Sequence, residues 1–113
     1  MSETGRKTFT FDEARALLPA VREKTRRALA ALDGLPLAGD EGADASRARL
    51  ERAVEGILNG WREEVEALGI EVKGPWLVDF DSGAGYYCWK YPERELGHFH
   101  SYEEGFAGRL PLT

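Results

Sequence analysis

The sequence predicts an α+β fold in which an antiparallel two-helix hairpin precedes a small antiparallel β-sheet. Apolar residues recur in steps of three and four through the first 69 residues, which is typical of helices that bury one stripe. After Gly69 the period changes to two, as in half-buried strands. Because the helices come before the strands instead of alternating with them, the class is α+β.

The first helix is predicted to begin at a capping box. Thr10 and Glu13 have the spacing at which each side chain can bond the other residue's backbone amide. Pro19 lies inside this helix and is expected to bend it, because proline removes one backbone hydrogen bond. The apolar stripe of this helix consists of Ala14, Leu18, Val21, Thr25, Ala28 and Leu32.

A flexible loop over residues 33–45, rich in Gly, Ala and Asp, is expected to follow. Ser46 is the predicted N-cap of a second helix that runs to about Leu68, and Gly69 suits a left-handed C-cap. Residues 10–69 would then form the hairpin. Its second stripe consists of Leu50, Val54, Ile57, Trp61, Val65 and Leu68.

Two glycines interrupt the second helix where alanine would be more stable. Gly56 and Gly60, next to Trp61, are expected where another backbone packs closely. We therefore predict a partner interface on this helix, with a homodimer formed through the helices.

Residues 70–113 are predicted to form a three-stranded antiparallel meander and a C-terminal tail, within a single domain of 113 residues. The first strand is expected over 70–80 with a break at Gly74 and Pro75, the second over 86–91, and the third over 95–100. Ser101 and Glu104 form a second capping box, which predicts a short helical turn ended by Gly105 or Gly108.

Composition excludes several classes of function. A net charge of −5 argues against nucleic-acid binding, which needs a basic surface against phosphate. No apolar run has the length of a membrane span. Cys88 is the only cysteine, so no disulfide framework is expected and a reducing cytoplasm is the predicted location.

Several short motifs resemble a family of uncharacterised bacterial proteins, the domain of unknown function numbered 2203. They are Leu77-Val78-Asp79-Phe80, Cys88-Trp89, and His100 followed by Glu104-Gly105-Phe106-Ala107-Gly108-Arg109. The N-terminal Phe9-Thr10-Phe11-Asp12-Glu13-Ala14 is similar to the first helix of that family. The resemblance covers nearly the whole chain and implies a helical hairpin with a small sheet, but no reaction or ligand. His98 departs from it, since an aromatic or apolar residue is usual there.

A metal site is one interpretation of the C-terminal residues. His98 and His100 lie two apart on a predicted strand and so face the same side, where their imidazoles could hold Zn or a similar divalent transition metal. Cys88 is a further group that could approach from the neighbouring strand. The alternative is that both histidines are ordinary strand residues and that Glu104 only caps a turn. The predicted ligand set is His98, His100, Glu103, Glu104 and Asp79.

An anion site is a second interpretation. Gly105 and Gly108 would let backbone amides converge beside the Arg109 guanidinium, which suits carboxylate or phosphate. The alternative is that Arg109 pairs with an acid such as Asp79 or Glu104 while the tail docks on the core.

Three functional hypotheses follow. The first is a non-enzymatic interaction or oligomerisation module built on the hairpin. The second is a small metal-dependent enzyme, such as a hydrolase, with Glu104 as the candidate catalytic general base. The third is an anion-binding regulator centred on Arg109.

Overall fold

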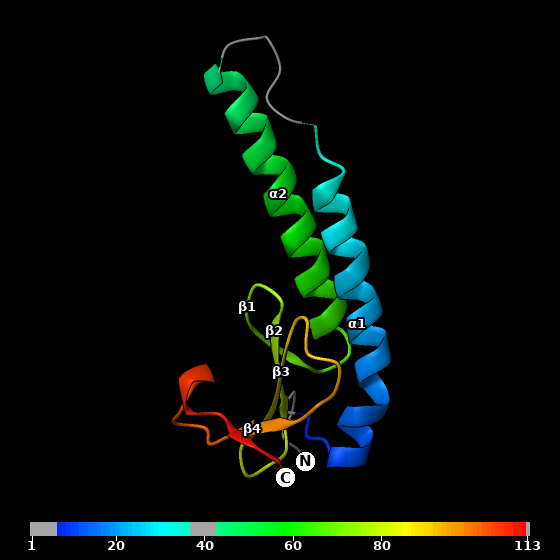
Figure 1. Cartoon of the computed structure of the whole chain (residues 1–113), viewed down its shortest axis with the longest axis vertical. Helices are drawn as coiled ribbons and strands as arrows, with labels where there is room; N and C mark the ends of the chain where they lie inside the picture. Colours follow the sequence, from blue (N-terminus) through cyan, green and yellow to red (C-terminus); the bar gives the residue numbers. More distant parts are fainter. Residues whose placement is uncertain (1–6, 37–42, 113) are drawn as a thin grey trace.

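Two long antiparallel helices and a five-stranded sheet make up the fold (Figure 1). The structure is a computed structural model, and it describes residues 7–36 and 43–112. Helix α1 spans Phe11–Asp33 and helix α2 spans Ala43–Glu66. The α+β class and the helical hairpin are therefore confirmed. Of the predicted 33–45 loop, residues 37–42 lie outside the described residues, whereas Asp33 is the last residue of α1 and residues 43–45 belong to α2, so the loop is shorter than predicted.

The start of α1 is the predicted capping box. The Thr10 hydroxyl accepts from the Glu13 amide at 3.0 Å, and the Glu13 carboxylate accepts from the Thr10 amide at 2.9 Å. Pro19 lies inside α1 on its exposed side. The bend expected there stays a prediction.

The start of α2 differs from the prediction. The helix begins at Ala43, so Ser46 lies within its first turn, 5% exposed, instead of capping it. Ala43 and Ala45 are strong helix formers, and the helix dipole favours the negative charge of Asp44 in the first turn, so the helix extends beyond Ser46. At the other end Gly69 has a φ of +87°, the left-handed conformation expected after a helix.

A buried hydrogen-bond chain joins the two helices. The Trp61 indole donates to the Thr25 hydroxyl at 2.8 Å, and that hydroxyl donates to the Val21 carbonyl at 2.8 Å. Trp61 also packs edge-on against Trp76 of the sheet region. The lower part of the hairpin is thereby fixed to the sheet. Within the described chain, neither helix combines the length and hydrophobicity that crossing a bilayer requires.

The sheet is an antiparallel meander whose spatial order follows the sequence order. Five strands replace the three that the sequence predicted. The strands are β1 (Glu71–Gly74), β2 (Leu77–Asp81), β3 (Tyr86–Lys90), β4 (His98–His100) and β5 (Leu110–Pro111).

The correction has a local cause between β1 and β2. The residues expected to break one strand instead reverse the chain, so that Gly74 faces Leu77 across a tight turn. Trp76 has a φ of +60° within this turn. A tryptophan seldom adopts that left-handed conformation, so residue type alone gave no signal of the hairpin. β5 is only two residues long and pairs with β4, which gives the tail its place at the sheet edge.

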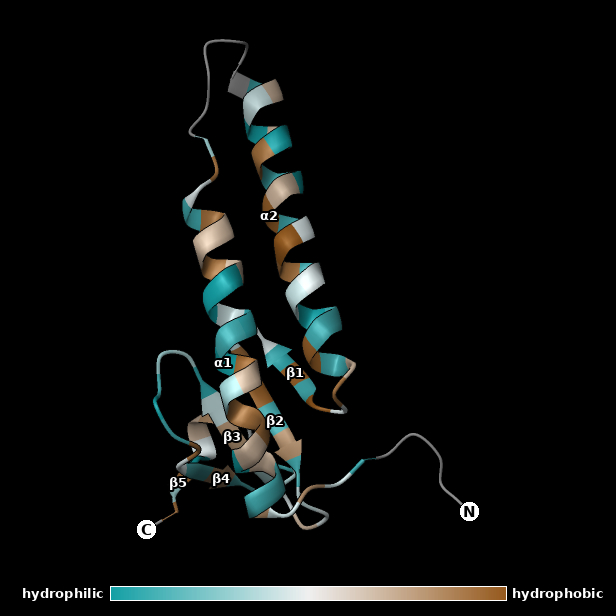
Figure 2. Ribbon diagram, turned by 90° about the vertical axis from the view of Figure 1, so that its right-hand side faces the viewer, coloured by the Kyte–Doolittle hydropathy of each residue, from teal (hydrophilic) through white to brown (hydrophobic). Residues whose placement is uncertain are grey.

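The two faces of the sheet differ in chemistry. One face packs against α1 and α2 and is apolar, with Val78, Phe80 and Trp89 fully buried in the main core. The upper half of the hairpin extends beyond the sheet, and apolar residues continue along α2 there (Figure 2). Residues that alternate with the core residues point to the opposite face of the sheet.

The C-terminal segment covers that opposite face, as the orange and red chain at the side of the sheet away from the helices shows in Figure 1. The predicted helical turn is present, but it is a 3-10 turn over Phe106–Gly108 and does not begin at Ser101. The Ser101 hydroxyl accepts from the Glu104 amide at 3.2 Å without starting a helix.

Candidate functional site

The candidate site lies on the polar face of the sheet, beneath the C-terminal segment. Strand register places Asp79 of β2 opposite Cys88 of β3, and Cys88 opposite His98 of β4. His100 lies two residues further along β4, opposite Tyr86. All of these side chains share one face because cross-strand partners point the same way.

His100 and Asp79 make the central contact. His100 Nε2 lies 2.9 Å from Asp79 Oδ2, and both side chains are buried, 4% and 2% exposed. His100 Nδ1 lies 2.8 Å from the Ser101 carbonyl oxygen. Because a carbonyl can only accept, Nδ1 carries the hydrogen. The Nε2 and carboxylate oxygens are then two acceptors that need a proton or a cation between them.

Cys88 completes a cluster of three. One ligand atom from each of Asp79, Cys88 and His100 lies within 4.8 Å of the other two, the one such group among the described residues. Asp79 Oδ1 is buried and has no hydrogen bond of normal geometry. Burial raises the pKa of Asp79, although the neighbouring thiol and His100 act in the opposite direction.

The thiol is not set up as a nucleophile. Burial and the adjacent Asp79 carboxyl raise the pKa of Cys88 to about 12. His100 cannot act as its base while both ring nitrogens are engaged by Ser101 and Asp79. The cluster therefore suits cation coordination better than covalent catalysis.

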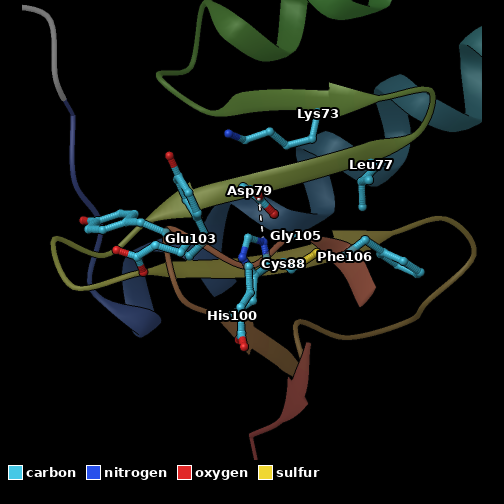
Figure 3. Close-up of a pocket in the computed structure, with 11 residues that line it drawn as sticks. Lys73, Leu77, Asp79, Cys88, His100, Glu103, Gly105 and Phe106 are labelled. Atoms are coloured by element: carbon cyan, nitrogen blue, oxygen red, sulfur yellow. Dashed lines mark hydrogen bonds and ion pairs between the residues drawn. The ribbon is translucent and has the colours of Figure 1, made fainter. Parts of the chain in front are cut away.

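A cavity of about 400 Å³ opens over this cluster. Figure 3 shows Lys73 and Leu77 on one side, with Glu103, Gly105 and Phe106 of the C-terminal segment on the other. Tyr86 and Tyr102 contribute aromatic rings, packed edge to face with centroids 5.1 Å apart. Asp79, Cys88 and His100 lie in the wall of this cavity.

The remaining predicted metal ligands lie outside the close cluster. His98 Nδ1 is 3.8 Å from Glu93 Oε2 instead of near His100 Nε2. Glu103 and Glu104 line the cavity from the exposed C-terminal segment. Glu104 folds over Gly108, where an added Cβ would come within 2.7 Å of the Glu104 Cβ.

Arg109 anchors the tail. Its Nη1 lies 2.8 Å from Glu93 Oε2, and its guanidinium lies 4.1 Å from the centre of the Phe106 ring. The side chain is 14% exposed. Its charge is thus engaged by an acid of the same chain, although the partner is neither Asp79 nor Glu104, the acids considered from the sequence. Gly105 is exposed, with no atom within 4 Å of an added Cβ.

The predicted partner interface separates into two parts. Trp61 is 4% exposed and belongs to the chain's own core. Gly56 and Gly60 lie beside a hollow of about 250 Å³, and an added Cβ at either position would meet nothing within 4 Å.

Cys88 was expected only as a further group near the metal ligands, and Lys73 and Tyr86 were not predicted to line the cavity. The signal for Cys88 was its alternation with Tyr87 and Trp89, which puts it on the face opposite the aromatic core. Lys73 and Tyr86 depended on strand register, which the sequence did not give.

These features define a small α+β domain with a buried Asp-Cys-His cluster beneath its own C-terminal segment. The family model described as "Uncharacterized conserved protein (DUF2203)" matches residues 7–112. The chain therefore belongs to the DUF2203 family, as its motifs indicated. No curated protein and no solved structure is similar enough to match it.

Proposed function

We propose that the protein binds one divalent transition metal ion, Zn²⁺ or Fe²⁺, through Asp79, Cys88 and His100. The observation that carries the proposal is the contact of His100 Nε2 with the Asp79 carboxylate, while Nδ1 is held by the Ser101 carbonyl. A metal ion between these atoms removes the clash of two acceptors. It also gives the buried Asp79 Oδ1 a partner.

The spacing of the three groups supports this proposal. A tetrahedral Zn²⁺ with ordinary bond lengths holds its ligand atoms about 3.5 Å apart. The three atoms lie within 4.8 Å of one another, and His100 Nε2 and Asp79 Oδ2 are 2.9 Å apart. Side-chain shifts of about 1 Å therefore suffice for tetrahedral coordination. The Ser101 carbonyl fixes the His100 ring in the manner of an outer-shell partner.

Three protein ligands favour a reactive centre over a purely structural one. Structural zinc sites use four protein ligands, whereas catalytic sites keep one position for water or substrate. The 400 Å³ cavity supplies room for such a position. The reaction class that we infer is metal-dependent hydrolysis, because a bound divalent ion makes water a nucleophile at neutral pH. Glu104 stays the candidate general base.

Metal titration tests the proposal. Protein purified without an affinity tag and stripped with chelator is titrated with Co²⁺, whose bond to a thiolate gives a charge-transfer absorption. One equivalent should bind, and Cys88→Ser should abolish the thiolate band. His100→Ala and Asp79→Asn should each weaken binding by at least about a hundredfold, since loss of an outer-shell partner alone costs up to that much.

His98→Ala and Glu104→Gln are the matched controls. Both residues lie near the site and outside the three-residue cluster, so their variants should keep the affinity of the wild type. Absence of stoichiometric binding would overturn the metal proposal, as would equal weakening by His98→Ala and His100→Ala. An enzyme requires a further result, turnover that depends on the metal; without it the centre is a binding site only.

A second candidate function is self-association through the hairpin. The observation that favours it is the hollow beside Gly56 and Gly60, together with the apolar stretch of α2 beyond the sheet (Figure 2). A second copy placed there would bury residues that one hairpin leaves half-exposed. Sedimentation of the wild type and of Gly60→Arg tests it: a dimer that Gly60→Arg dissociates supports the idea, and a wild-type monomer ends it.

A further inference from the structure

Two adjoining hollows lie between the first half of α1 and the loop that joins β3 to β4. They have volumes of about 430 and 340 Å³ and share Pro19, Arg22 and Arg94 in their walls. Both views place this loop beside α1 (Figures 1 and 2). Two arginines from separate elements thus stand at the boundary between the hollows.

These two arginines carry uncompensated charge. Within residues 7–36 and 43–112, neither Arg22 nor Arg94 has an ion pair or a side-chain hydrogen bond. The chain as a whole has a net charge of −5, so a local cationic excess runs against its general charge. Like charges brought together in this way attract anions.

Among the described residues, three acids lie in the walls of the hollows, and two of them are engaged elsewhere; the third, Glu95, is exposed in the wall of the smaller hollow. Glu23 pairs with Arg26, and this contact holds the pKa of Glu23 below its ordinary value. Glu93 pairs with Arg109 at 2.8 Å and accepts from the Lys90 amide at 2.9 Å. Neither carboxylate is therefore available to neutralise Arg22 or Arg94.

The larger hollow also offers an apolar surface. Trp89, Tyr91 and Pro92 form part of its wall, and Tyr91 is 41% exposed. Tyr91 packs edge-on against Trp89 with ring centroids 6.4 Å apart. An aromatic surface next to two guanidinium groups is suited to a planar molecule that carries an oxyanion.

We propose that this groove binds a small organic anion, with its phosphate or carboxylate held between Arg22 and Arg94. Its planar apolar part lies against Tyr91 and Pro92 in the larger hollow. The planar fork of arginine matches both kinds of oxyanion, which a lysine would recognise less specifically. This site is separate from the metal centre, because Trp89 faces the helices whereas Cys88 points to the opposite side of the sheet.

Calorimetric titration with phenyl phosphate and with benzoate tests the groove and distinguishes the two oxyanions. Phenol, which has the aromatic ring without the oxyanion, and inorganic phosphate, which has the oxyanion without the ring, are the half-probes. We expect saturable binding of at least one aromatic anion, tighter than either half-probe. Arg22→Gln and Arg94→Gln should each weaken it by about tenfold or more, the value of one charge-assisted hydrogen bond.

Arg47→Gln and Arg52→Gln are charge-matched controls, since both arginines are exposed on α2, away from the groove. These two variants should bind the anion with the affinity of the wild type. The affinity of Arg22→Lys should lie between those of the wild type and Arg22→Gln. No saturable binding of either aromatic anion would overturn the proposal. The proposal would also be overturned if phenol bound as tightly as the aromatic anions, or if Arg47→Gln and Arg52→Gln weakened anion binding as much as Arg22→Gln and Arg94→Gln.

Discussion

The two faces of the sheet are built from the same strands, but one buries apolar side chains and the other buries polar ones. On β2, Val78 and Phe80 face the helices and pack in the core, while Asp79 and Asp81, which alternate with them, face the C-terminal segment. All four side chains are at most 2% exposed. Burial alone therefore does not distinguish the faces.

What distinguishes them is how the buried groups are satisfied. Core side chains need only close packing, whereas a buried carboxylate needs hydrogen bonds or a cation. Asp81 has such bonds from the Gly83 amide at 2.8 Å and the Tyr102 hydroxyl at 2.7 Å. Asp79 has His100 on Oδ2, whereas Oδ1 has no hydrogen bond of normal geometry and the carboxyl's other polar neighbour is the weakly donating Cys88 thiol. Of the two buried carboxylates, Asp79 is therefore the one for which a bound cation is proposed.

The largest expected difference concerns the reactivity of Cys88. With a pKa of about 12, the thiol is ionised roughly a thousandfold less at pH 7 than an ordinary cysteine. Iodoacetamide should therefore modify the native, metal-free protein at least about a thousandfold more slowly than the urea-unfolded chain. Mass spectrometry measures both rates, and comparable rates would show that the polar face opens readily.

Phe80→Ala tests the apolar face and has the largest expected effect on stability. The ring is fully buried and packs edge-on against Phe9 at a centroid distance of 5.5 Å. Its removal should lower the free energy of unfolding by about 3–5 kcal/mol. Urea denaturation followed by circular dichroism measures the loss. A loss below about 1 kcal/mol, the size expected for a surface site, would contradict the assignment of this face as the core.

Asp79→Asn tests the neighbouring position on the polar face through its pH dependence. Burial raises the pKa of Asp79 above the ordinary 3.8, so the folded chain binds this proton more tightly than the unfolded chain. Protonated Asp79 therefore contributes to the free energy of unfolding. This contribution is fully present below about pH 4 and is lost as the pH rises through the raised pKa of the folded chain.

As the pH rises from about 3.5 to 7, the wild type should therefore lose stability relative to Asp79→Asn. The shift should amount to about 1.4 kcal/mol for each unit by which burial raises the pKa. Urea denaturation in chelator at several pH values gives this curve. A difference that grows in favour of the wild type would mean that pairing with His100 outweighs burial.

The sequence was informative wherever local chemistry decides the structure. The capping box at Thr10 and Glu13 needs only neighbouring residues, and it is confirmed. The apolar spacing through residues 10–69 correctly indicates two helices. These features depend on spacing alone, so one sequence suffices to find them.

The sequence was uninformative wherever register and long-range contacts decide. The spacing of His98 and His100 correctly predicts a shared face, yet their neighbours differ: one lies by Glu93 and the other by Asp79. The turn through Trp76 rests on a left-handed tryptophan that packs against Trp61. That contact crosses from helix to sheet, which no local pattern reports.

Tyr102→Phe has the smallest expected effect and tests whether the C-terminal segment holds the polar face closed. The hydroxyl donates to Asp81 Oδ1 at 2.7 Å, and the Gly83 amide still bonds that oxygen after the substitution. The free energy of unfolding should therefore fall by only about 0.5–1.5 kcal/mol, the net value of one typical hydrogen bond.

Alkylation of Cys88 should nevertheless become faster in the folded Tyr102→Phe protein, because the C-terminal segment loses a hydrogen bond that holds it to the sheet on one side of the cavity. Leu112→Ala, at an exposed position of the tail, is the control and should leave the rate unchanged. If Tyr102→Phe lowers stability without affecting alkylation, the segment does not govern access to Cys88, and the thiol is protected by the packing of the sheet alone.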